Sequence, residues 1–115
     1  MKIVERAGVF TIPDTDVEVH WIEHLRVPDM SVGTYSIPIG GSDGQSPHTE
    51  DEIYVVTAGR ATIEAGHERI QVGPGSVIFV PAFEVHRFTD ITEDLALLVV
   101  FAPAEESRGV PAPQG

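Results

Sequence analysis

Glycine and proline interrupt this chain too often for it to form long helices. The 115 residues include 11 glycines and 9 prolines, spread along the sequence, and no stretch keeps a helical hydrophobic period over a useful length. Between these breaks lie short runs rich in valine, isoleucine, threonine and aromatic residues. That pattern is typical of an all-β sandwich or barrel, so we predict short strands joined by turns.

The predicted strands follow the apolar runs between turn signals. The first is an edge strand interrupted by Gly8, and a turn at Ala58-Gly59 joins the two strands of a hairpin. The last is apolar on both faces, as expected of a strand that is covered on both sides. The predicted strands are residues 3–12, 17–27, 31–39, 53–57, 60–64, 68–72, 76–80, 86–89 and 95–101.

The length of the chain suits a single domain with one core. We expect that domain to cover residues 1–103. Residues 104–115, AEESRGVPAPQG, have almost no large apolar side chain to repay their ordering entropy, so we predict a flexible C-terminal tail. The chain has no cysteine, which excludes disulfides, thiolate metal sites and cysteine nucleophiles.

The charge of the chain limits its partners. Eighteen acidic residues against seven basic ones give a formal net charge of −11, which repels phosphate groups, so we expect neither nucleic acid nor anionic membrane as a partner. The longest apolar run, residues 95–102, is too short to cross a bilayer, and no secretory signal is visible. We therefore expect a cytoplasmic protein.

Metal-capable side chains gather in residues 40–59, which contain His48, Glu50, Asp51 and Glu52. Iron, manganese, nickel and zinc ions accept imidazole nitrogen and carboxylate oxygen as ligands. His48 and Glu52 would lie about 13 Å apart in an extended strand, so the chain must bend between them if both are to bind one ion. His86 would join them from a separate strand 34 positions after Glu52.

Two stretches resemble the two motifs of the cupin family. GGSDGQSPHTEDEIYVVTAG is similar to the first motif, and GSVIFVPAFEVHRFTD is similar to the second. Three positions depart from the pattern: Ser46 replaces the first histidine, Phe83 a glycine and Asp90 an asparagine. The landmarks at matching spacings are Gly40, His48, Glu52, Gly59, Gly75, Pro81 and His86.

The resemblance implies a single cupin jelly-roll β-barrel with one divalent ion, of iron, manganese, nickel or zinc, bound by His48, Glu52 and His86. Two imidazoles and one carboxylate also resemble the facial triad of non-haem iron oxygenases. Ser46 removes one of the usual ligands, and Gln45 or Glu50 could supply a replacement oxygen. A homodimer is expected as well, because small cupin-like proteins often pair.

Two questions stay open at the level of sequence. Some residues have both a structural and a functional interpretation: Glu50 and Asp51 are expected in a solvated acidic turn, and four aromatic residues are expected in the core or the barrel lining, where some could contact a substrate. The function is that of a small metalloenzyme of dioxygenase or isomerase type that acts on a small molecule in the barrel, of a non-catalytic small-ligand-binding or sensor module, or of a packed structural barrel. The four aromatic residues are Tyr35, Tyr54, Phe79 and Phe88, of which Tyr35, Tyr54 and Phe88 are the substrate-binding candidates.

Overall fold

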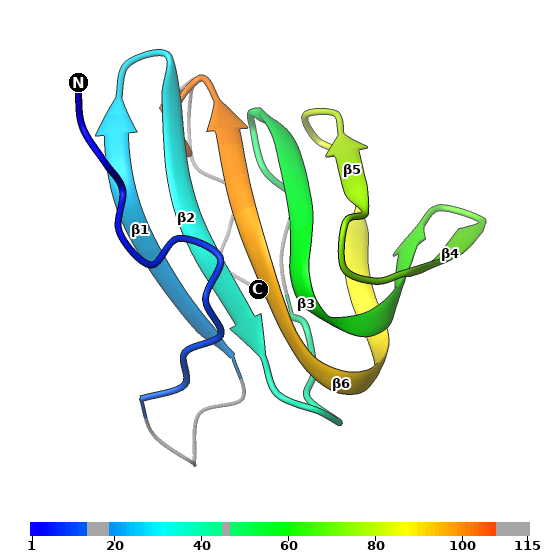
Figure 1. Cartoon of the computed structure of the whole chain (residues 1–115). Coiled ribbons are helices and arrows are strands. Elements are labelled where there is room, and N and C mark those ends of the chain that lie inside the picture. The colour runs from blue at the N-terminus through cyan, green and yellow to red at the C-terminus, as the bar shows by residue number, and fades with distance from the viewer. Residues whose placement is uncertain (14–18, 45–46, 108–115) are drawn as a thin grey trace.

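The computed structural model describes residues 1–13, 19–44 and 47–107. These residues contain no helix and form one antiparallel sheet of six strands in the order β1-β2-β6-β3-β4, with β5 paired to β3 (Figure 1). The long strands β3 and β6 bend together, so the sheet curls into a jelly-roll-like shape, as the sequence predicts. The strands are β1 (His20–Val27), β2 (Met30–Ile37), β3 (Asp51–Ala65), β4 (Glu68–Val72), β5 (Val77–Val80) and β6 (His86–Ala102).

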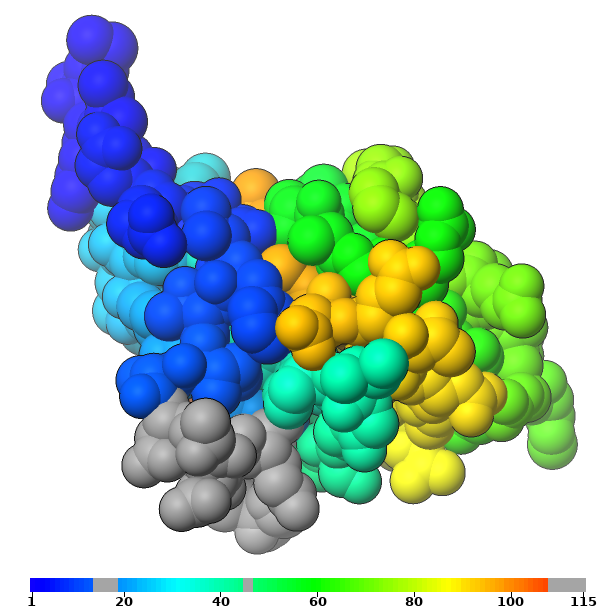
Figure 2. Space-filling model, turned by 60° about the horizontal axis from the view of Figure 1, so that its bottom comes forward, coloured from blue at the N-terminus to red at the C-terminus, as the bar shows by residue number. Residues whose placement is uncertain are grey.

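The predicted edge strand at residues 3–12 is wrong, because this segment forms turns and irregular backbone. Gly8 adopts a left-handed conformation with φ +79°, which ends any extended run. The backbone amide of Gly8 donates to the Thr34 hydroxyl at 2.8 Å, and that of Thr11 donates to the Ser36 hydroxyl at 3.0 Å. The segment therefore lies on the outer face of β2, while the start of the chain projects from the body (Figure 2). Part of the strand predicted at 17–27 falls on residues outside the described ranges.

The predicted turn at Ala58-Gly59 is also wrong, because β3 runs through it without reversing. The register against β6 shifts between Val56 and Ala58 and again beyond it, as β-bulges do. Gly59 has φ +87°, and a Cβ added there would stand 2.2 Å from the carbonyl oxygen of Asp94. The glycine therefore marks a bulge with a close backbone approach. In the same way, the strands predicted at 86–89 and 95–101 are one continuous strand, β6.

The core lies inside the curl of the sheet. Alternate residues of β6 point inward from Leu95 to Phe101, and Tyr35, Tyr54 and Phe88 are buried with them. The prediction that Phe79 lies in the core or the barrel lining is wrong, since 60% of its surface is exposed. On β5 the residues that face inward are Ile78 and Val80, which pair with Tyr54 and Glu52 of β3. The alternation of a strand then forces Phe79 outward. The described residues include no helix that could span a membrane.

Candidate functional site

The candidate site depends on the curl of the sheet. Glu52 lies near the start of β3 opposite Phe101, whereas His86 opens β6 opposite Ala65, at the other end of the same ladder. In a flat sheet these two side chains would be separated by most of the length of β3. Because β3 and β6 bend, the Nε2 atom of His86 comes within 3.3 Å of Oε1 of Glu52.

Two groups besides the Glu52 carboxylate contact the imidazole ring of His86. Its Nδ1 lies 2.8 Å from the carbonyl oxygen of Glu84, and its Nε2 lies 2.9 Å from the hydroxyl of Tyr54. Burial lowers the pKa of His86, but its interactions with the Glu52 carboxylate and the Glu84 carbonyl outweigh burial, and that pKa stays above its ordinary value. The contact with the Glu84 carbonyl requires a proton on Nδ1. Nε2 is therefore the nitrogen that faces the site.

The Glu52 carboxylate is the most unusual group in the site. Only 2% of Glu52 is exposed, and neither carboxylate oxygen accepts a hydrogen bond. A buried carboxylate without hydrogen bonds is costly unless a cation lies beside it, and His86 at 3.3 Å supplies one only when it is protonated. This environment suits a positively charged ligand or ion next to Glu52.

His48 approaches this pair from the loop before β3. Its ring centre lies 6.2 Å from that of His86 and 4.8 Å from that of Phe101, and its Nδ1 lies 3.5 Å from Oε2 of Glu105. Across the described ranges, no three histidine, cysteine, aspartate or glutamate side chains are arranged so that they could hold a metal ion as they stand. The donor types fit a divalent ion, and Glu52 and His86 already lie within 3.3 Å of each other, but His48 would have to move closer to share the ion with them. Gln45 and Ser46 lie outside the described residues.

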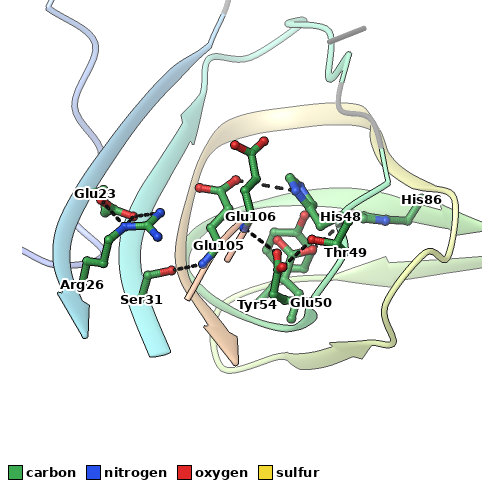
Figure 3. A network of polar contacts seen from close by, with 11 residues as sticks. Glu23, Arg26, Ser31, His48, Thr49, Glu50, Tyr54, His86, Glu105 and Glu106 are labelled. Atoms are coloured by element: carbon green, nitrogen blue, oxygen red, sulfur yellow. Dashed lines mark hydrogen bonds and ion pairs between the residues drawn. The ribbon is translucent and has the colours of Figure 1, made fainter. Parts of the chain in front are cut away.

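The prediction that Glu50 lies in a solvated acidic turn is wrong. Glu50 is 1% exposed, and its two oxygens accept from the Thr49 hydroxyl and, at 2.6 Å, from the backbone amide of Glu106 (Figure 3). Asp51, its neighbour, is partly buried and accepts from the backbone amide of Ala82 at 2.9 Å. Glu50 thus holds the chain that follows β6 to the loop that precedes β3.

Residues 104–107, which we call the C-terminal segment, reach this site although the sequence places them in the tail. Ala104 is buried, and Glu105 brings its carboxylate to His48 (Figure 3). Burial is the largest of the causes that raise the pKa of Glu105 to about 7, and repulsion from nearby carboxylates, that of Glu106 first, adds to it. No motif or periodicity marks Glu105, because its role depends on where the chain turns after β6. Residues 108–115 lie outside the described ranges, and their flexibility stays a prediction.

The aromatic candidates divide between two positions. Tyr54 touches His86 and packs its ring edge-on against Phe88, with ring centres 4.9 Å apart. Tyr35 donates from its hydroxyl to Asp43 at 2.8 Å, and the same carboxylate accepts from the backbone amide of Phe88 at 2.8 Å. Of these aromatic candidates, Tyr54 is the one that contacts His86 of the Glu52–His86 pair. The sequence does not mark Asp43 as a site residue, because an aspartate in a glycine-rich loop is indistinguishable from an ordinary loop residue.

Comparison with known proteins supports the same fold. An uncharacterized protein of Streptomyces coelicolor is 49% identical over 85 residues, which are 74% of this chain and 81% of that protein. KdgF from Halomonas sp. has a similar structure, with a TM-score of 0.69 and 20% identity over 82% of this chain and 94% of that one. TT1209 from Thermus thermophilus gives a TM-score of 0.70 with 23% identity, covering 90% and 97% of the two chains.

A longer protein, the DMSP lyase DddQ from Ruegeria pomeroyi, gives a TM-score of 0.73 with 18% identity, covering 97% of this chain and 58% of that one. At these identities the structural likeness shows the fold alone. The profile described as "Cupin domain" matches residues 33–101, which include both motifs up to the end of β6. Together with the jelly-roll-like sheet, this match shows that the chain belongs to the cupin domain family.

Proposed function

We propose that this protein is a small-molecule-binding cupin whose interior site holds one divalent metal ion through His48, Glu52 and His86. The observation that carries the proposal is the buried Glu52 carboxylate, which has no hydrogen bond and lies 3.3 Å from Nε2 of His86. A metal ion bound there would polarise an oxygen-bearing ligand. The ion would also supply the positive charge that this carboxylate lacks whenever His86 is neutral.

The residues of the chain have separate roles in this proposal. Glu52 supplies negative charge, and His86 presents Nε2 because the Glu84 carbonyl holds its Nδ1. Tyr54 donates its hydroxyl to that Nε2 at 2.9 Å when the imidazole is neutral, so this hydroxyl must turn away when Nε2 binds a ligand. It is then placed to donate a hydrogen bond to a molecule bound beside His86. We assign Tyr54 to ligand binding, with Phe88 behind it and Tyr35 further along the barrel.

Metal analysis of the purified full chain, supplied with iron, manganese, nickel or zinc, tests the proposal. We expect about one equivalent of metal in the wild type and a loss of at least tenfold in affinity in Glu52→Gln and His86→Ala. His67→Ala is the matched control, because His67 is exposed in the turn between β3 and β4 and should leave the metal content unchanged. A wild-type content below about a tenth of an equivalent with every metal would refute a metal site.

The second candidate is a ligand-binding or sensor module that needs no metal. It is favoured by the position of His48, whose ring centre lies 6.2 Å from that of His86, so that no three candidate ligands of the described residues are arranged to hold an ion as they stand. Such a module would be stabilised thermally by its ligand in the presence of a chelator, without turnover. A metalloenzyme of dioxygenase or isomerase type would lose both ligand stabilisation and turnover in the same chelator. The comparison of the two conditions separates the candidates.

We also propose a homodimer formed through the outer face of β3 and β5. Ile53 of β3 pairs with Phe79 of β5, and Val55 pairs with Val77. Ile53, Val77 and Phe79 are exposed, so this face is apolar, and β5 is a short strand without charged residues. Light scattering should give twice the chain mass for the wild type and one chain mass for Phe79→Glu. Ile70→Glu is the control, since Ile70 is equally apolar and exposed but lies on β4. A monomeric wild type at high concentration would remove the proposal.

A further inference from the structure

The C-terminal segment is anchored to buried parts of the barrel although no strand contains it. The backbone amide of Glu105 donates to the Ser31 hydroxyl at 2.9 Å, and that of Glu106 donates to the Glu50 carboxylate at 2.6 Å. Both acceptor residues are almost fully buried. A third contact, from the amide of Ala104 to the carbonyl of Pro28 at 3.4 Å, holds the segment at the β1–β2 turn. Two parts of the chain, the β1–β2 turn with the start of β2 and the loop before β3, thus fix the backbone that carries Glu105.

This anchoring places the Glu105 side chain against His48, with 3.5 Å between Oε2 and Nδ1 and with 19% and 16% of the two side chains exposed (Figure 3). The position is electrostatically unfavourable for a carboxylate, because burial and the neighbouring carboxylates both disfavour its charge. The geometric feature that points to a role for this carboxylate is its contact with His48.

Each of the two histidines of the site has an oxygen atom beside its Nδ1, at 2.8 Å for His86 and at 3.5 Å for His48. Nδ1 of His86 lies 2.8 Å from the Glu84 carbonyl oxygen, and Nδ1 of His48 faces the Glu105 carboxylate. Histidine ligands in metal sites commonly donate one ring nitrogen to an oxygen outside the site, which fixes the tautomer and leaves the other nitrogen to the ion. We infer that Glu105 is a positioning residue that holds the proton of His48 on Nδ1 and so presents Nε2 to the ligand site. The benefit of this tautomer for ligand binding rests on the proposed function, but the tautomer of His48 itself can be tested separately.

Nitrogen NMR of the histidine rings in the full-length, metal-free protein measures the tautomer directly. At about pH 8.5, where the Glu105 carboxylate is charged, we expect the proton of His48 on Nδ1 in the wild type. Glu105→Ala should move the proton population toward Nε2, whereas Glu105→Gln should restore Nδ1 because its amide oxygen can accept the bond. Glu106→Ala is the control, since it removes a neighbouring carboxylate and keeps the backbone amide that binds Glu50.

Zinc binding supplies the second readout. We expect Glu105→Ala to weaken zinc affinity by roughly tenfold and Glu106→Ala to change it by less than about twofold. The inference is overturned if His48 carries its proton on Nε2 in the wild type, or if Glu105→Ala leaves the tautomer unchanged. If the wild type binds no zinc, the proposed metal site fails while the tautomer experiment still decides the role of Glu105. If the wild type and Glu105→Ala bind zinc equally and His48 has the same tautomer in both, only the positioning role of Glu105 fails.

Discussion

We predict that Glu105→Gln stabilises the metal-free protein above pH 7 and has little effect below about pH 4.5. The pKa of Glu105 is raised from its ordinary value of 4.5 to about 7, with burial as the largest cause. The folded state therefore binds the proton more tightly than the unfolded state. This contribution to stability is complete below the unfolded pKa and is lost as the pH rises through the folded pKa. Glutamine stays neutral at every pH and avoids the loss.

The difference between about 7 and 4.5 corresponds to about 3 kcal/mol, at 1.36 kcal/mol per pH unit. Solvent reaches part of the carboxylate, since 19% of the side chain is exposed, and this reduces the effect. We expect Glu105→Gln to raise the free energy of unfolding by about 1–3 kcal/mol at pH 8, and by less than about 0.5 kcal/mol at pH 4.

Urea unfolding of the full chain in chelator, followed by tryptophan fluorescence at several pH values, measures this difference. Trp21 is a suitable probe, because it packs against Tyr35 and Phe101 in the core. Glu84→Gln is the control, since the Glu84 side chain is exposed and the substitution removes the same charge from a solvated position. Equal stability of Glu105→Gln and wild type at pH 8, or a less stable variant, would show that the Glu105 carboxylate is not desolvated.

Three further changes test the backbone and the core, each by urea unfolding. Phe83→Gly should raise stability by about 1 kcal/mol, because Phe83 has φ 68° and an exposed ring; a loss would contradict this. Gly59→Ala should cost more than about 3 kcal/mol, since its Cβ meets the Asp94 carbonyl, whereas Gly66→Ala, with open space, should cost about 1 kcal/mol. Asp43→Asn should cost about 2 kcal/mol, because an amide cannot accept both hydrogen bonds; a neutral result would show that they contribute little.

The positions of the strands were predictable where alternation and turn residues agree. β4 is found at the predicted residues, and β2 and β5 differ from their predictions only at the ends. The prediction failed at Gly59, because a glycine that opens a bulge and a glycine that closes a turn are both selected for a positive φ. Only the pairing with β6 distinguishes the two. The prediction of an edge strand at residues 3–12 was also wrong, because backbone amides of this segment donate to side chains of β2 and not to the backbone of a neighbouring strand.

Burial of charged residues was not predictable from local sequence. Glu50 and Glu52 sit in one acidic run, yet Glu50 is held by two hydrogen bonds from Thr49 and the C-terminal segment, while Glu52 has none. Composition alone treats both as surface residues, because carboxylates are rarely buried unless they are paired, and the cupin resemblance singled out Glu52 but not Glu50 as a ligand of the interior site. The partner of Glu50 is 56 positions away in the chain. A sequence pattern cannot report a contact of that separation.

The amino-acid sequence by itself determined the all-β class and the cupin motifs, since glycines, prolines and β-branched runs act through local backbone preferences. Which groups meet was decided by the tertiary structure. Glu52 and His86 lie at opposite ends of one strand ladder, and only the bending of β3 and β6 brings them to 3.3 Å. The chain after β6 reaches His48 for a different reason, because the end of β6 pairs with the start of β3, where Ala102 lies opposite Asp51, and Glu105 then contacts His48. Curvature adds up over many residues of paired backbone, so no short stretch of sequence encodes it.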